Sequence, residues 1–218
     1  MPRFDHHVHT SRHSPDSDID PLELLSRARA AGLDGVVITE HDYQWRADEL
    51  GELASRGDAI GLQVLSGAEV SAREGHFLVY GLPNLAEARP GVLLKNLLKV
   101  VRRHSAAIVA AHPFRWDQDF EAIVAEHGPA FDALELVSNN ITPETRRQTA
   151  RLLARHSMGA TGSSDGHAPD VVGCYFTEFP DPIHDLTAFV SALRDRLGKP
   201  GHRVGVALAS GLVDGGGG

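Results

Sequence analysis

Short apolar segments alternate with segments of helical periodicity along almost the whole chain. Residues 35–39 (Gly-Val-Val-Ile-Thr) show no polar alternation, as expected for a strand that is buried on both faces. The pattern predicts strands at residues 3–9, 35–39, 63–65, 76–80, 107–111, 133–137, 159–162, 175–176 and 204–208. It predicts helices at residues 21–31, 47–56, 92–103, 117–126, 143–156 and 186–197.

Two of the predicted helices begin with clear capping signals. Asp20, Pro21 and Glu23 occupy positions typical of an N-cap and a first turn, and Gly32 is typical of a C-terminal cap. Thr142 precedes Pro143 and Glu144 in the same way. These signals support the predicted order of strands and helices independently of hydrophobicity.

The repeated strand-then-helix order predicts an α/β protein with a mostly parallel sheet. No GxGxxG follows the first strand, which argues against a dinucleotide-binding fold. We expect a closed or nearly closed (β/α) barrel, distorted or limited to seven units because 218 residues fall short of the typical ~250. Residues 1–212 are predicted to form a single domain, and the Gly-rich tail at 213–218 is predicted to be disordered.

Composition narrows the class of protein. The 21 Lys and Arg against 29 Asp and Glu give a formal net charge of −8, which argues against a basic surface for nucleic acid or anionic lipid. Cys174 is the only cysteine, so the chain has no intrachain disulfide and fits a reducing compartment. Because the sequence contains neither an apolar run of about 18 residues nor a signal-peptide pattern, we expect a cytoplasmic protein without a membrane span.

Histidine and acidic residues gather where the predicted strands end. The chain contains 13 histidines. In a barrel the carboxyl ends of all strands meet at one face, where barrel enzymes hold their active sites. The residues at these ends are His7, His9, His41, Glu69, His112, Glu135, Asn139, Asp165 and His167. They are therefore expected to share one pocket.

The spacing of these residues is typical of metal ligands. In His7-Val8-His9 and Asp165-Gly166-His167 the paired side chains point the same way and lie ~6–7 Å apart along an extended segment. Imidazole and carboxylate without thiolate indicate catalytic Zn, Mn or Fe. The candidate ligands exceed the needs of one ion, and a carboxylate such as Glu69 can bridge two, so we expect two to three divalent ions. Such ions activate water and neutralise charge on a transferring phosphoryl group.

Five motifs resemble those of the PHP (polymerase and histidinol phosphatase) superfamily. They are DHHVHT with SPDS (residues 5–10 and 14–17), TEHD (39–42), GAEVS with GHFLVYG (67–71 and 75–81), IVAAHP (108–113) and GSSDGH (162–167). Each motif alone is weak, but the ordered set is specific and spans about three quarters of the chain. The resemblance implies a distorted (β/α)7 TIM-like barrel with a trinuclear metal site, and phosphoesterase chemistry in many members.

The resemblance also implies how the ligands are shared. His7, His9, Glu69 and Asp165 would hold a first ion, Glu69 would bridge to a second held also by His76 and His112, and Asp16, His41 and His167 would hold a third. A hydroxide between ions would attack phosphorus, and Glu69, Asp165 and His167 are the expected catalytic residues. Glu40 departs from the Asp that is usual in the second motif, and His6 from a common apolar residue. Neither departure removes a ligand, although Glu40 is expected to alter the contacts that orient the ligands.

For several of these residues the sequence leaves a second role open. Asp16 could belong to a polar turn, His13 is a rival ligand in the same loop, and His76 is assigned from the motif alone. Arg12 and Arg115 are candidate substrate residues because an arginine can pair with phosphate through two N–H groups, and solvated loop cations are the alternative. Asp42, Glu135 and Asn139 are expected to support the ligands or the fold. Surface or packing roles are expected for His104, His127, His156, His184 and His202.

The leading functional hypothesis is a metal-dependent phosphomonoesterase that acts on a small phosphorylated metabolite. The alternatives are a metal-dependent hydrolase of a carbon centre, a nuclease-type phosphodiesterase and a non-catalytic barrel domain. The net charge of −8 argues against a nucleic-acid substrate. The number of convergent polar residues argues against a domain that has lost catalysis. Substrate identity, metal identity and oligomeric state stay open at this stage.

Overall fold

The computed structural model describes residues 1–128 and 130–203. The first part of the chain contains β1 (Arg3–Val8), α1 (Pro21–Ala30), β2 (Gly35–Ile38), α2 (Ala47–Asp58), β3 (Gln63–Ser66), β4 (Ala68–Ala72), β5 (Gly75–Tyr80) and α3 (Leu94–Arg103). The second part contains β6 (Ala107–Ala110), α4 (Phe120–His127), β7 (Ala133–Val137), α5 (Pro143–Arg155), β8 (Gly159–Gly162), β9 (Tyr175–Glu178), α6 (Leu186–Arg194) and β10 (Lys199–His202). Short 3-10 turns lie at Arg115–Asp117 and Pro169–Val171.

The predicted helix starts at Pro21 and Pro143 are confirmed. Asp20 Oδ1 accepts hydrogen bonds from the backbone N–H groups of Leu22 (2.8 Å) and Glu23 (3.2 Å). Thr142 Oγ1 accepts from Thr145 N at 3.2 Å. In both helices a short polar side chain satisfies N–H groups that the first turn leaves free.

The strands form two five-stranded mixed sheets, in the orders β10-β9-β1-β2-β3 and β4-β5-β6-β7-β8. The predicted distorted (β/α)7 TIM-like barrel is therefore wrong, because the ladders of the described strands do not close into one sheet. Among the described residues, the β-bridges between the two sheets are limited to two isolated ones, Val8 with Gly166 and His41 with Glu69. Antiparallel pairs of β4 with β5, β5 with β6, and β9 with β1 and β10 also break the expected parallel order.

One break between the sheets lies at Gly67, between β3 and β4. Only this residue separates β3 from β4, so no helix crosses between them and the chain passes directly from one sheet into the other. A Cβ at Gly67 would lie 2.7 Å from the carbonyl oxygen of Val79, so a side chain here would clash with backbone. The sequence pattern placed residues 67–71 after the predicted strand at 63–65, whereas residues 68–71 belong to β4, the first strand of the β4–β5 hairpin.

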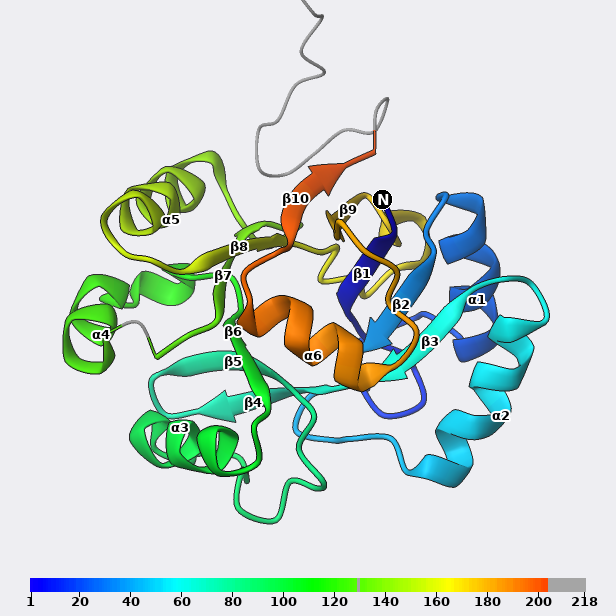
Figure 1. The fold of residues 1–218 in the computed structure, drawn as a ribbon, viewed down its shortest axis with the longest axis horizontal. Helices are drawn as coiled ribbons and strands as arrows, with labels where there is room; N and C mark the ends of the chain where they lie inside the picture. The colour runs from blue at the N-terminus through cyan, green and yellow to red at the C-terminus, as the bar shows by residue number, and fades with distance from the viewer. Residues whose placement is uncertain (129, 204–218) are drawn as a thin grey trace, which may run out of the picture.

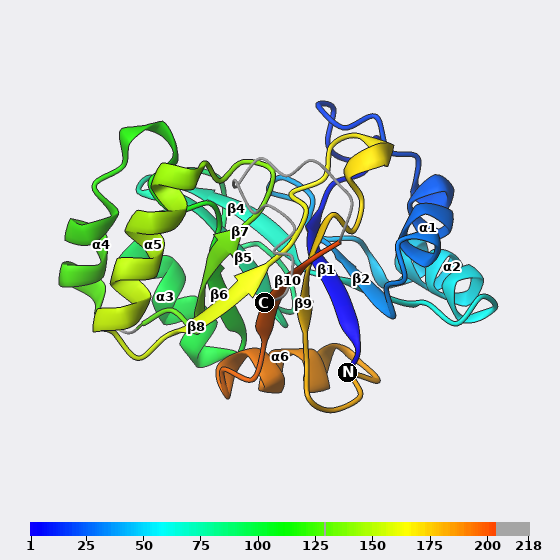
Figure 2. The ribbon, with the colours of Figure 1, turned by 90° about the horizontal axis from the view of Figure 1, so that it is seen from above.

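Helices cover the outer faces of the two sheets (Figure 1). α1 and α2 lie beside β1–β3, and α3, α4 and α5 lie beside β4–β8. α6 lies across one end of the sheets, where Phe189 packs against Phe4 and Tyr80. Figure 2 shows α6 at the end where β1 begins, while the segments that follow β1 and β8 lie at the opposite end. That opposite end carries most of the predicted ligands.

The predicted strand at 204–208 and the tail at 213–218 lie outside the described residues. The single domain at 1–212 therefore stays a prediction. Among the helices that the structure describes, none is long and apolar enough to cross a membrane.

Candidate metal centre

A bulge in β1 separates the roles of its adjacent histidines. Asp5 pairs with Val36 and Val8 with Ile38, so β1 carries one more residue than β2 across this interval. Bulges of this kind redirect side chains. His6 contacts Tyr80 and Phe189 in the core, whereas His7 and His9 approach each other with ring centroids 5.1 Å apart. Both members of the predicted His-x-His pair thus reach the same space.

Glu69 lies at the centre of the cluster, buried on β4. Its Oε2 lies 3.3 Å from Nε2 of both His7 and His9, and 2.9 Å from Nδ1 of His41. Its Oε1 lies 2.8 Å from Nδ1 of His76 and 3.1 Å from Nε2 of His112. One carboxylate therefore faces five imidazoles that come from both sheets.

Asp165 approaches the same imidazoles from the segment after β8. Its Oδ1 lies 3.3 Å from His7 Nε2 and 3.6 Å from His9 Nε2, and its Oδ2 lies 3.8 Å from His112 Nε2. The side-chain amide of Asn140 donates to Oδ2 at 2.5 Å. This amide orients the carboxylate with Oδ1 toward His7 and His9.

Asp16, His41 and His167 form the more exposed side of the cluster. Asp16 Oδ2 lies 3.2 Å from His41 Nε2 and 3.4 Å from His167 Nε2, and these two nitrogens lie 3.3 Å apart. The rival residue His13 instead stacks on Tyr43 at a centroid distance of 3.9 Å. The structure therefore brings Asp16 to the cluster and leaves His13 beside it.

The donor set fits divalent ions. Four groups have ligand atoms that all lie within 4.8 Å of one another: His7, His9 and Glu69; His7, His112 and Asp165; His41, Glu69 and His76; His9, His41 and His167. The buried Nε2 atoms of His7 and His9 make no hydrogen bond to any described residue. A buried polar atom without a partner costs about 1–3 kcal/mol, and an ion at this position would satisfy it.

Charges within the cluster shift one another's pKa values. Burial lowers the pKa of His7 and His9, but the carboxylates outweigh it: Asp165 and Glu69 raise the pKa of His7 well above its usual value and that of His9 to about 9. Burial raises the pKa of Glu69 and Asp165, but His7 and its neighbours lower both well below the usual range. The metal-free cluster therefore holds protons, which bound cations would release.

Glu135 supports two of the predicted ligands from inside β7. Its Oε1 accepts from His7 Nδ1 at 3.1 Å and from Ser163 Oγ at 2.6 Å, and its Oε2 accepts from the backbone N–H of His112 at 2.8 Å. Because Nδ1 of His7 donates to this carboxylate, the neutral ring that a cation would bind has its lone pair on Nε2. The expected supporting role of Glu135 agrees with these contacts.

Two predicted ligands adopt strained backbone conformations. His112 has φ of 28° and Asp165 has φ of 50°, in the left-handed region that residues other than glycine rarely occupy. Such strain is retained where surrounding contacts fix the residue, often at functional sites. The bond from His112 N to Glu135 and the bond from Asn140 to Asp165 are contacts of this kind.

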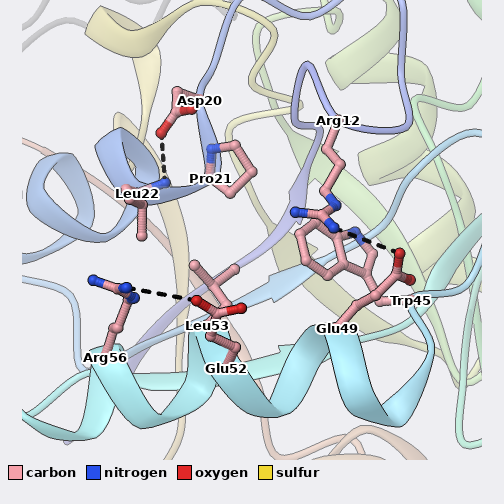
Figure 3. A pocket seen from close by; sticks show the side chains of 9 residues that line it. All are labelled: Arg12, Asp20, Pro21, Leu22, Trp45, Glu49, Glu52, Leu53 and Arg56. Carbon is pink, nitrogen blue, oxygen red and sulfur yellow. Dashed lines mark hydrogen bonds and ion pairs between the residues drawn. The ribbon is translucent and has the colours of Figure 1, made fainter.

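The two candidate substrate arginines lie in different places. Arg115 Nη1 lies 3.8 Å from Asp165 Oδ2, and its guanidinium lies 4.3 Å from the ring centroid of Trp116. The Trp116 ring, 57% exposed as a residue, contacts His76 and His112 edge-on. Arg12 instead packs over Trp45 beside Glu49, on a pocket between α1 and α2 (Figure 3). Of the two candidate arginines, Arg115 lies beside the proposed ligands and Arg12 lies beside Trp45 and Glu49.

Asn140 is a site residue that the sequence pattern missed. The pattern singled out its neighbour Asn139, whose amide donates to Ser164 O (2.7 Å) and to Cys174 Sγ (3.2 Å) and thus supports the loop before Asp165. No signal in the sequence distinguishes the two asparagines. Asp42 accepts from Ser71 N at 2.8 Å, a structural contact. No contact with the cluster is made by His104, His127, His156, His184 or His202, as far as the described residues show.

Comparisons with known proteins support the sequence resemblance. A family model described as PHP-associated (PHP_C) matches residues 143–196, from α5 to the residues after α6. No curated protein matches the chain.

Three of the solved structures that match the chain illustrate the shared fold. PsfC from Pseudomonas syringae PB-5123 is 22% identical over 93% of this chain and 92% of its own, with a TM-score of 0.68. An amidohydrolase from Chromobacterium violaceum, solved with bound sulfate and no metal, is 18% identical over 93% and 98%, with a TM-score of 0.65. A candidate metal-dependent phosphoesterase from Bifidobacterium adolescentis ATCC 15703 is 20% identical over 87% and 95%, with a TM-score of 0.62.

Proposed function

We propose that the chain, whose motifs resemble those of the PHP superfamily and whose residues 143–196 match a PHP-associated family model, is a metal-dependent hydrolase whose substrate is a small phosphomonoester. The proposed ligands are His7, His9, Asp16, His41, Glu69, His76, His112, Asp165 and His167, which would hold two to three ions of Zn, Mn or Fe. Glu69, Asp165 and His167 are the proposed catalytic residues among them. The structural relative described as a candidate metal-dependent phosphoesterase supports this class of reaction.

One observation carries the proposal: side chains from both sheets converge on Glu69 with buried imidazole nitrogens that lack a hydrogen bond to described residues. A structural ion pair would not need five imidazoles around one carboxylate. Nitrogen and oxygen donors without thiolate suit a catalytic rather than a structural site. Bound divalent ions would activate water and offset charge on phosphoryl oxygens.

The balance of charge in the site favours an anionic substrate. The nine proposed ligands include three carboxylates, so three divalent ions would leave the site positive even with Glu135 added. A terminal phosphate dianion suits that charge better than a neutral ester. The net charge of −8 on the whole chain disfavours an extended polyanion, so a small phosphate is expected rather than nucleic acid.

The exposure of the proposed ligands suggests the side from which substrate arrives. The side chains of His7 and His9 are fully buried, whereas that of Asp16 is 56% exposed and those of His41 and His167 are about a quarter exposed. Arg115 and Trp116 are also partly exposed beside the cluster. We propose that the substrate phosphate enters here and pairs with Arg115.

The test combines metal analysis with a substrate panel. The purified chain is expected to bind two to three equivalents of Zn²⁺ or Mn²⁺, and less than one equivalent after reconstitution would contradict the proposal. The panel compares kcat/KM for small phosphomonoesters, bis-p-nitrophenyl phosphate, single-stranded oligonucleotides and simple amides. Diester or oligonucleotide turnover tenfold faster than monoester turnover would favour a nuclease-type activity. Turnover of amides alone would favour the alternative of a metal-dependent hydrolase that acts on a carbon centre. The structural relative described as an amidohydrolase is the reason to include amides in the panel.

A further inference from the structure

Glu40 is a fully buried carboxylate that faces four hydrogen-bond donors. Its Oε2 accepts from Thr10 N (3.0 Å) and Ser14 Oγ (2.6 Å), and its Oε1 accepts from Thr10 Oγ1 (2.5 Å) and Trp45 Nε1 (2.9 Å). The Thr10 and Trp45 N–H groups can only donate. The carboxylate is therefore held in one orientation by three residues, Thr10 and Ser14 from the loop after β1 and Trp45 from the segment after β2.

The hydroxyl of Ser14 completes its own hydrogen bonding in this arrangement. It has one hydrogen, which it donates to Glu40, and two lone pairs. The backbone N–H of His41, which can only donate, lies 3.3 Å from Oγ, and Nδ1 of His9 also lies 3.3 Å from it. Because the hydrogen of Ser14 is already used, His9 must be the donor in the remaining contact.

We infer that Glu40 and Ser14 are positioning residues for the proposed metal ligands His9 and His41. The inference rests on the proposed metal binding. Glu40 fixes the direction of the Ser14 hydroxyl, and Ser14 then selects the tautomer of His9 that carries its proton on Nδ1. In the neutral ring that an ion would bind, Nε2 of His9, which lies close to Glu69 and Asp165, thereby carries the lone pair. The same hydroxyl holds the backbone of His41 in place.

Trp45 extends this positioning system toward the outside of the protein. Its indole is only 5% exposed, and its N–H donates to Glu40. Arg12 packs over its ring at 5.5 Å on the pocket between α1 and α2 (Figure 3). Glu40 thus accepts one hydrogen bond from the Ser14 hydroxyl, which orients His9, and another from the indole N–H of Trp45, which lines that pocket. The pocket wall and the proposed ligands are linked by consecutive hydrogen bonds.

The test measures zinc affinity of the metal-free, full-length protein by competition with a chromophoric chelator. Ser14→Ala is expected to weaken Zn²⁺ binding about 10–100-fold, the usual effect of losing a residue that orients a ligand. Ser14→Thr keeps the hydroxyl and is expected to restore affinity to near wild type. Ser138→Ala is the matched control, since it removes a buried hydroxyl that makes no hydrogen bond to described residues.

A second variant and a spectroscopic measurement keep the test decisive if Ser14→Ala does not fold. Trp45→Phe keeps a ring but removes one donor to Glu40, and is expected to weaken zinc binding about fivefold, as for the loss of one hydrogen bond. Nitrogen-15 NMR of zinc-loaded wild-type protein is expected to show His9 protonated on Nδ1 and bound through Nε2.

Zinc bound through Nδ1 of His9, or wild-type affinity in both Ser14→Ala and Trp45→Phe, would overturn the positioning role alone. A wild-type protein that takes up no zinc would overturn the proposed function as well, so the two failures are distinguishable.

Discussion

His6 and His7 are neighbours on β1, yet they belong to two regions of opposite character. His6 lies in the core beside α6, where Nδ1 contacts the Tyr80 hydroxyl at 2.7 Å and Nε2 contacts Thr177 Oγ1 at 3.1 Å. His7 has Nδ1 bonded to Glu135 and Nε2 facing Glu69 and Asp165 without a hydrogen bond to described residues. Both rings are fully buried.

The difference lies in the charge of the partners and in whether both nitrogens are satisfied. Neutral hydroxyls around His6 do not compensate burial, so burial lowers its pKa to about 4. Three carboxylates around His7 overcome burial and raise its pKa. A buried histidine with two neutral partners is a packing residue, whereas one with a free nitrogen among carboxylates is a candidate ligand.

The largest expected effect comes from breaking the ligand side at its centre. Glu69→Gln removes the charge that faces five imidazoles, and losing one partner of a buried charge pair costs about 3–5 kcal/mol. We expect kcat/KM for a phosphomonoester to fall about a thousandfold, with a loss of bound metal. The exposed Glu121→Gln is the matched control. Similar, mild effects from both variants would show that the catalytic site lies elsewhere.

In the metal-free protein, His9 on the ligand side and His6 on the core side should change the free energy of unfolding in opposite directions as the pH rises. The pKa of His9 is raised to about 9, so its contribution to stability is complete below about pH 6.5 and is lost as pH rises through 9. The pKa of His6 is lowered to about 4, so its contribution is complete above about pH 6.5 and is lost as pH falls through 4. Each shift corresponds to about 3 kcal/mol.

Urea unfolding in the presence of chelator, from pH 4.5 to 9.5, measures these contributions as differences between wild type and variant. The wild-type minus His9→Gln difference should shrink on the alkaline side, and the wild-type minus His6→Gln difference on the acid side. Burial raises the pKa of Asp5 to about 6, so Asp5 makes the folded state more stable as the pH falls, opposite to His6. Because wild type and variant both contain Asp5, its effect cancels when their free energies of unfolding are subtracted. Parallel, pH-independent differences would contradict the assigned environments.

A smaller effect is expected from removing one hydroxyl on the core side. Tyr80→Phe deletes the group that contacts His6 Nδ1 and donates to the His6 carbonyl oxygen at 2.9 Å. The free energy of unfolding should fall by about 1–3 kcal/mol, because a buried nitrogen loses its partner. Metal content should stay unchanged, as measured on the same sample. Lost metal would mean that the two sides of β1 are not independent.

The smallest effect separates the two arginines. Arg115→Ala should raise KM for a phosphomonoester about tenfold, since a charged hydrogen bond to phosphate contributes about 1.5 kcal/mol. Arg12→Ala should leave KM within twofold, because Arg12 packs on Trp45 away from the cluster. Equal changes in KM would indicate that Arg115 does not contact the substrate.

Local signals in the sequence predicted most elements well. The bounds of β7 and β8 agree with the predicted strands, and the caps at Asp20 and Thr142 place α1 and α5. Most of the proposed ligands were predicted because histidine and carboxylate recur at strand ends, and this pattern does not require the sheets to close. Asp16 and His76 were assigned from the family resemblance. The ligands at strand ends converge because these strands end at the same side of the protein, whether or not the sheets close into a barrel.

Pairing between strands could not be predicted in the same way. Local periodicity does not show which strands hydrogen-bond, so the break at Gly67 and the β4–β5 hairpin were missed. The bulge at His6 and His7 depends on the register of β1 against β2. Ser14 lies in the SPDS motif, but the motif does not indicate its contact with Glu40, and Asn140 lacks any sequence signal. The roles of both arise from contacts with residues distant in the chain.

Because the strands form two separate sheets, the proposed ions would also stabilise the fold. His7 lies in β1, and His9 and His41 follow β1 and β2 of the same sheet. Glu69 and His76 lie in β4 and β5 of the other sheet, and His112 and Asp165 follow its strands β6 and β8. Ions held by both sets would hold together two sheets whose described strands share no hydrogen-bonded ladder, only the isolated bridges of Val8 with Gly166 and His41 with Glu69. Binding to the folded state alone stabilises it by RT ln(1 + [L]/Kd). The durability of this fold would then follow the free metal concentration around it, and a shortage of metal would shorten the lifetime of the protein as well as slow its catalysis.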